Sequence, residues 1–154
     1  MDDDEPPPSL LRLELTENSC WKPEGDQWND LEKAGLELAR LAQVSEGELE
    51  AGVHLCDADE MKELHEKFMN DPTVTDVMSF DGDGGYLGDV VACVDVAREE
   101  GEALGHGLWP ELMFYVLHGL LHNMGHDDAS PQEREAMHDL QRKALRSIGV
   151  EVAS

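Results

Sequence analysis

The chain has 154 residues, enough for one domain with its own core, and its 40% hydrophobic and 30% charged residues are typical of a globular protein. Its net charge of -24 disfavours binding to nucleic acids and anionic membranes, because a polyanionic surface repels them over roughly a Debye length. No apolar run approaches the ~20 residues of a membrane span, and the acidic N-terminus lacks the apolar core of a secretory signal, so we expect a cytoplasmic protein.

The three cysteines favour neither a disulfide framework nor a thiolate zinc site. Cys20, Cys56 and Cys93 are odd in number, widely spaced and without a C-x-x-C pair. We therefore interpret them as small apolar residues that fill space in the core.

The first half of the chain is predicted to contain two strands and two helices. Residues 1–8 combine acids with three prolines and are expected to form a disordered lead-in, so the folded domain would span residues 9–154. Apolar residues partly alternate over the strands and recur at helical spacing over the helices. In chain order the predicted elements are a strand at Leu10–Leu15, a helix at Gln27–Ala42, a strand at Glu48–Cys56 and a helix at Asp57–Met69.

The second half is predicted to contain two more strands and three helices. The strands Val74–Phe80 and Leu87–Val94 flank the turn D-G-D-G-G at residues 81–85 and are expected to be paired or adjacent. That turn superficially resembles a calcium loop, but it lacks the spaced ligands and the closing glutamate. Helices are predicted at Val96–Leu104, Pro110–Met124 and Ser130–Ser147. Without strict βαβ alternation, the order favours an α+β fold, with one mixed sheet of about four strands packed with about five helices.

The most informative stretch is H-G-L-L-H-N-M-G-H-D-D at residues 118–128. His118 and His122 are four residues apart, so on a helix their imidazoles project from one face and can converge on one ion. Gly125 suits the end of that helix, after which the chain can return a third ligand from residues 126–128. We favour the carboxylate of Asp128, three residues beyond the glycine, and interpret His126 as a residue beside the ligands or facing the substrate.

Three protein ligands that leave a position for water are typical of a catalytic zinc site. We therefore expect one Zn²⁺ ion, with another divalent metal as the alternative. Zinc peptidases of the H-E-x-x-H type use the glutamate beside the first histidine as general base, and Gly119 occupies that position here. Peptide hydrolysis is thus disfavoured. A metal-bound water that attacks a phosphodiester becomes the better candidate, with no protein base assigned.

The same stretch resembles the signature H-G-x-L-H-x-x-G-x-D-H of the YbeY-type rRNA maturation endoribonucleases. The segments T-D-V-M-S-F at residues 75–80 and L-G-D-V at residues 87–90 are similar to that family too, and order and spacing agree from about residue 48 to 149. The resemblance implies a zincin-like α+β domain. It also implies a metal-dependent endoribonuclease that cuts single-stranded RNA in 16S rRNA maturation and ribosome quality control.

On this hypothesis the metal ligands are His118, His122 and Asp128. The partners are single-stranded or ribosomal RNA and, in addition, ribosomal proteins. Further residues could face the substrate or hydrogen-bond to the ligands: His126, Asp127, Asp76, Ser79 and Asp89.

Two positions depart from the family pattern. Asp128 stands where the family usually has a third histidine, and an anionic oxygen would hold the metal harder and make it less Lewis-acidic. Met69 stands where members often carry an arginine that could bind phosphate, and Lys62 or Lys67 could replace it. Two alternatives remain: a ribosome-associated assembly module with a structural metal, and a zincin-like peptidase.

Overall fold

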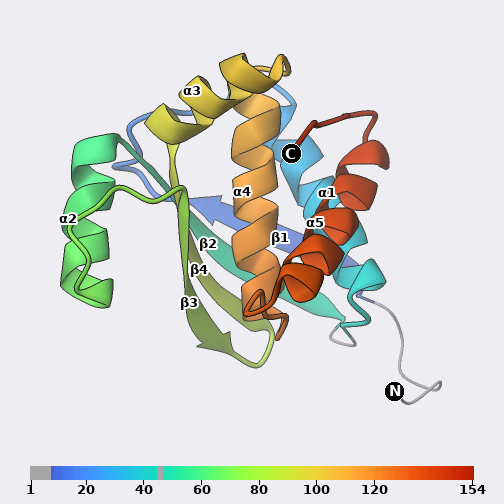
Figure 1. Ribbon diagram of the computed structural model, residues 1–154. Coiled ribbons are helices and arrows are strands. Elements are labelled where there is room, and N and C mark those ends of the chain that lie inside the picture. The colour runs from blue at the N-terminus through green and yellow to red at the C-terminus, as the bar shows by residue number, and fades with distance from the viewer. Residues whose placement is uncertain (1–7, 45–46) are drawn as a thin grey trace.

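One four-stranded mixed sheet forms the centre of the protein (Figure 1). The computed structural model describes residues 8–44 and 47–154, so nearly all of the predicted lead-in at residues 1–8 lies outside the described residues. In the order β1-β2-β4-β3, the first three strands are parallel and β3 runs antiparallel to β4. The strands are β1 Leu10–Leu15, β2 Glu48–Cys56, β3 Val77–Asp83 and β4 Tyr86–Cys93.

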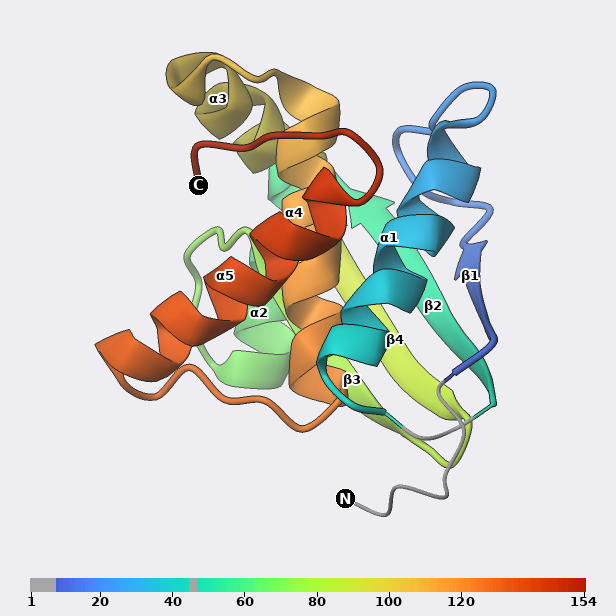
Figure 2. The ribbon, with the colours of Figure 1, turned by 90° about the vertical axis from the view of Figure 1, so that its right-hand side faces the viewer.

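Helices cover both faces of this sheet. Helices α1 and α4 lie on one face, and α5 packs against the outside of both (Figure 2). Alternate residues of β4 point to opposite faces, so Val90 and Ala92 join the main core while Val91 and Cys93 pack with Met61 of α2 on the other face. The helices are α1 Gln27–Leu41, α2 Ala58–Met69, α3 Val94–Leu104, α4 Leu108–Asn123 and α5 Pro131–Arg146. Four strands and five helices within the described residues confirm the predicted α+β fold.

The β3–β4 hairpin differs from the prediction at both ends of β3. The strand begins at Val77 rather than Val74, because Asp76 accepts a 2.8 Å hydrogen bond from the Val77 amide and so holds the chain in a bend before the ladder. It continues to Asp83, which pairs with Tyr86. The turn therefore needs only Gly84 and Gly85, and Gly84 has φ of 60°.

Helix α4 is the buried centre of the fold, and ten of its residues are buried. It begins at Leu108, two residues earlier than predicted; Pro110 is tolerated there because the first turn of a helix has no intrahelical partners for its amides. No described helix is both long and apolar enough to cross a membrane.

The cysteine interpretation holds for two of the three residues. Cys56 and Cys93 are buried neighbours at the ends of β2 and β4, whereas Cys20 is exposed. Partial burial raises the pKa of the Cys20 thiol, and the carboxylates of Asp57 and Asp95 raise it further. Cys20 is therefore a protonated surface thiol rather than a core residue.

Gly119 allows α4 to lie directly on the sheet. A Cβ atom at this position would be 2.7 Å and 2.9 Å from the two methyl carbons of Val90 on β4. Val90 is fully buried and β-branched, so its methyl groups have little room to move. The glycine thus sets the distance between the sheet and the helix segment that carries both histidines.

We expect Gly119→Ala to lower the free energy of unfolding. Overpacking of a core typically costs about 1–3 kcal/mol, which outweighs the ~1 kcal/mol that alanine gains over glycine in a helix. Urea denaturation would measure this, with Gly47→Ala as the control because a Cβ there meets no atom within 4 Å. The double variant Val90→Ala/Gly119→Ala should lose less than the sum of its single variants. Unchanged stability of Gly119→Ala would contradict the packing explanation.

Candidate metal centre

The end of α4 brings the predicted ligands together. The chain leaves the helix through a left-handed Gly125, whose φ is 100°. The amide of Gly125 donates to the carbonyl of His122, and the amide of His126 donates to the carbonyl of Leu121, both at 3.0 Å. This pair of bonds is the Schellman motif, which satisfies the last carbonyls of the helix and reverses the chain direction. The reversed segment returns Asp128 to the histidines.

The donor atoms of His118, His122 and Asp128 all lie within 4.8 Å of one another. One oxygen of Asp128, Oδ2, is 3.2 Å from Nε2 of His118 and 3.5 Å from Nε2 of His122. Tetrahedral zinc with ligands at about 2.0–2.2 Å has ligands about 3.4 Å apart. The two separations from Asp128 to the histidines match this spacing, and the three residues together could hold one divalent ion.

The charge of Asp128 suits this role. Partial burial acts to raise the pKa of its carboxyl group, but the neighbouring His122 and His118 outweigh burial and leave the pKa below its usual value. The carboxylate is therefore ionised at neutral pH and offers an anionic oxygen beside the two imidazoles.

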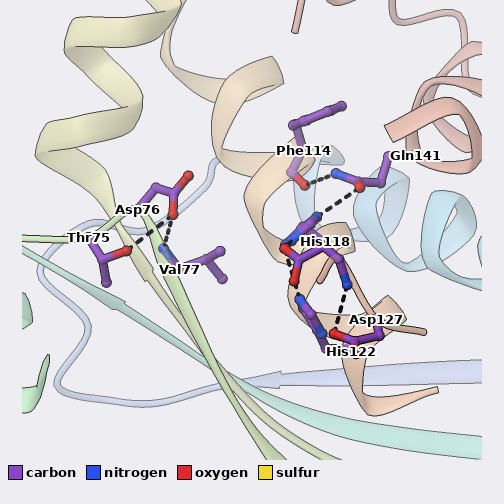
Figure 3. A network of polar contacts seen from close by, with 9 residues as sticks. Thr75, Asp76, Val77, Phe114, His118, His122, Asp127 and Gln141 are labelled. Carbon is purple, nitrogen blue, oxygen red and sulfur yellow. Dashed lines mark hydrogen bonds and ion pairs between the residues drawn. The ribbon is translucent and has the colours of Figure 1, made fainter. Parts of the chain in front are cut away.

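Gln141 of α5 fixes the orientation of His118 (Figure 3). The amide nitrogen of Gln141 donates to the backbone carbonyl of Phe114 at 2.9 Å, so the amide oxygen faces Nδ1 of His118 at 3.0 Å. Because that oxygen only accepts, Nδ1 is the donor in this contact, and Nε2, which faces Asp128 at 3.2 Å, is the nitrogen that would offer its lone pair to a metal. A partner of this kind on the second ring nitrogen is common in metal-binding histidines.

Gln141 lies outside the histidine motif and was not predicted, although its sequence position carries one signal. The residue is buried between Met137, Ala144 and Leu145 on the apolar face of α5. A polar side chain in the middle of an apolar helix face needs a hydrogen-bond partner. Only the packing of α5 against α4 reveals that the partner is His118.

The three candidate ligands line a cleft of roughly 880 Å³ between α4, β3 and parts of α2, α3 and α5. Asp76 and Ser79 of the predicted set also line it, on the side of β3. Asp76 accepts a hydrogen bond from the Val77 amide at 2.8 Å, and its second partner is the Thr75 hydroxyl at 3.4 Å (Figure 3). Its carboxylate is thus engaged in holding the start of β3.

Three predicted residues are not among the described residues that line the cleft: His126, Asp127 and Asp89. The carboxylate of Asp127 accepts a 2.8 Å hydrogen bond from the amide of Asp128, so it supports the turn that carries the ligand. Asp89 accepts a hydrogen bond from the Tyr86 hydroxyl at 2.5 Å on the far part of β4. His126 belongs to the Schellman turn through its backbone.

Comparison with known proteins agrees with the sequence motif and with the fold. A family model described as "Endoribonuclease YbeY" matches residues 16–149. A relative of that name from Renibacterium salmoninarum is 39% identical over 111 residues, which cover 64% of this chain and 71% of the relative. Another from Bifidobacterium adolescentis is 33% identical over 146 residues, 88% of this chain and 78% of the relative. The solution structure of TM1509 from Thermotoga maritima is similar with a TM-score of 0.58 at 25% identity, covering 90% of this chain and 89% of that one.

We expect Gln141→Leu to weaken zinc binding by roughly 10- to 100-fold, because His118 loses the partner that fixes its ring and its tautomer. Competition with a chromophoric chelator, on protein without a histidine tag, would measure the Kd. Gln132→Leu, an exposed position of the same helix, is the matched control.

The melting temperature of metal-free Gln141→Leu separates a local effect on the site from a loss of folding. A Kd for zinc within twofold of the wild-type value would contradict the orienting role of Gln141.

Proposed function

This chain belongs to the YbeY endoribonuclease family, and from that premise we propose that it hydrolyses single-stranded RNA at a metal ion held by His118, His122 and Asp128. The observation that carries the proposal is the single Asp128 oxygen that lies 3.2 Å and 3.5 Å from the two Nε2 atoms, inside the cleft. We propose residues 9–154 as the catalytic domain, a cytoplasmic location, and 16S rRNA maturation and ribosome quality control as the role.

The donor set favours zinc. Two imidazoles and one carboxylate form a common ligand set of catalytic zinc sites, whereas magnesium and calcium prefer oxygen ligands. When bound, such an ion supplies a Lewis acid for a phosphoryl oxygen and a more acidic water as nucleophile. The chain's own contribution is to hold His118 through Gln141 and to place a negative charge at Asp128. That charge would make the site less Lewis-acidic than one with three histidines.

The lining of the cleft supports single-stranded RNA as the substrate. Apolar side chains form part of its walls: Met69, Val74, Phe80, Leu104 and Phe114. Unpaired bases can leave the stack and rest on aromatic or apolar surface, whereas a duplex presents mainly its sugar–phosphate backbone. The half-buried Phe80 packs edge-to-face against Phe68, with ring centroids 5.1 Å apart.

Gly119 weighs against a peptidase for two reasons. It offers no group that could take a proton, and any side chain at this position would meet the Val90 methyl carbons. A glutamate in the H-E-x-x-H position would therefore require α4 to move away from the sheet. Phosphodiester hydrolysis without a protein base at residue 119 remains compatible with the packing.

The negative net charge of the chain suggests which further molecules it binds. A net charge of -24 repels free RNA but attracts basic proteins. We propose that ribosomal proteins, which are basic, help to bring this chain to its RNA substrate.

We expect metal-loaded protein without a histidine tag to cut a labelled single-stranded RNA and to spare the same strand annealed to its complement. His118→Ala should lower kcat/KM by a factor on the order of 10³, because several kcal/mol of transition-state stabilisation is lost with the metal. A chelator should abolish cleavage. His54→Ala is the control, since His54 bonds to Glu60 and Thr16 on the other face of the sheet.

Gel analysis of the products would decide the outcome. If the metal-loaded protein leaves the RNA intact while chelation lowers its melting temperature, the metal is structural and the assembly module is the better hypothesis.

A further inference from the structure

The cleft has an unusual balance of fixed charges for an RNA-binding site. Its lining includes four carboxylic acids and, among the described residues, one lysine or arginine, which is Arg134. The acids are Asp76, Glu100, Glu111 and Asp128. Every linkage of an RNA strand carries a negative charge, so a strand in this cleft needs a nearby cation besides the metal.

Arg134 lies on the face of α5 that leads to the metal ligands. Arg134, His138 and Gln141 follow one another at intervals of four and three residues, so they share one side of the helix. Gln141 contacts His118 at 3.0 Å, and the ring of His138 lies 5.6 Å from the ring of His118. Arg134 is one further helical turn towards the N-terminus of α5, where the helix meets the cleft.

Arg134 is also the arginine that no carboxylate neutralises within residues 8–44 and 47–154. The other five arginines all pair with an acid: Arg12, Arg40, Arg98, Arg142 and Arg146. Even Glu135, the next residue in the chain, pairs with Arg142 instead. In a chain with 35 acidic and 11 basic side chains, an exposed arginine without an ion pair is available for an external anion.

The lysines considered as replacements for the missing arginine are not in this position. Neither Lys62 nor Lys67 is among the residues that line the cleft, and the ammonium of Lys67 lies 5.2 Å from the centre of the Phe68 ring. Met69 lines the cleft but brings no charge. The cation in the cleft thus comes from α5 rather than from α2.

We propose that Arg134 binds a backbone phosphate of the RNA beside the metal site and so positions the strand for cleavage. This inference rests on the proposed function. A planar guanidinium can donate two parallel N–H bonds to the oxygens of one phosphate, which fixes both distance and orientation. Because backbone phosphates are the same at every base, Arg134 contributes affinity and register without selecting a sequence.

The test compares Arg134→Gln with Arg146→Gln, which removes the same charge from the same helix at a site outside the cleft lining. The substrate is a 5′-fluorescein-labelled single-stranded RNA of 12 nucleotides, and the protein is the full metal-loaded chain. We expect Arg134→Gln to raise KM by roughly 10- to 100-fold, as for loss of a charge-assisted hydrogen bond, with a smaller change in kcat. Arg134→Lys should recover only part of the loss, because it keeps the charge but not the paired donors.

The salt dependence distinguishes a phosphate contact from a structural role. Loss of one phosphate contact should reduce the slope of log K against log salt by about 0.7 for a single strand. An unchanged slope, or a KM equal to that of Arg146→Gln, would overturn the proposal. If the wild-type chain leaves the RNA uncut, the proposed activity fails. A fluorescence-anisotropy titration then gives the Kd of the same RNA for Arg134→Gln and Arg146→Gln. Equal Kd values for the two variants would overturn the role of Arg134.

Discussion

Helix α4 can lie directly on β3 and β4 because residue 119 has no side chain, and this close contact decides where the candidate metal ligands lie. A Cβ atom there would be 2.7 Å from a methyl carbon of Val90. The two histidines flank this contact point at positions 118 and 122, so they sit at a fixed height above the strands. The Schellman turn at Gly125 then brings Asp128 back to within 3.2 Å of His118. The site is thus built on rigid elements, with one short turn supplying the third ligand.

The elements and the ligand group were predictable where the signal is local. Helical spacing predicted that His118 and His122 share a face, and Gly125 predicted the turn that returns Asp128. The start of β3 was not predictable, because apolar residues from Val74 onwards suggest a strand while the bend depends on the hydrogen bond from Val77 to Asp76. Gln141 and Arg134 lie on the following helix, α5. The contact of Gln141 with His118 and the role proposed for Arg134 depend on how α5 crosses α4, and periodicity along one helix contains no information on that crossing.

The acidic composition and the nuclease family are compatible at the level of individual side chains. Net charge describes long-range repulsion, whereas binding depends on the groups that a strand meets in the cleft. In the cleft those groups are apolar side chains, four carboxylic acids including the candidate metal ligand Asp128, and the guanidinium of Arg134, with which no carboxylate in the described part of the chain pairs. The phosphate contact proposed for this one arginine, together with the candidate metal, would let an anionic protein accept an anionic substrate.

The central claim is that His118, His122 and Asp128 hold one divalent ion, and the most direct test is the metal content of the protein. Elemental analysis should use protein expressed in zinc-replete medium without a histidine tag. The account predicts about one zinc per chain in the wild type and much less in Asp128→Asn, which removes the negative charge with little change in shape. A folded wild-type protein without stoichiometric metal, or an Asp128→Asn variant with the full amount, would contradict it.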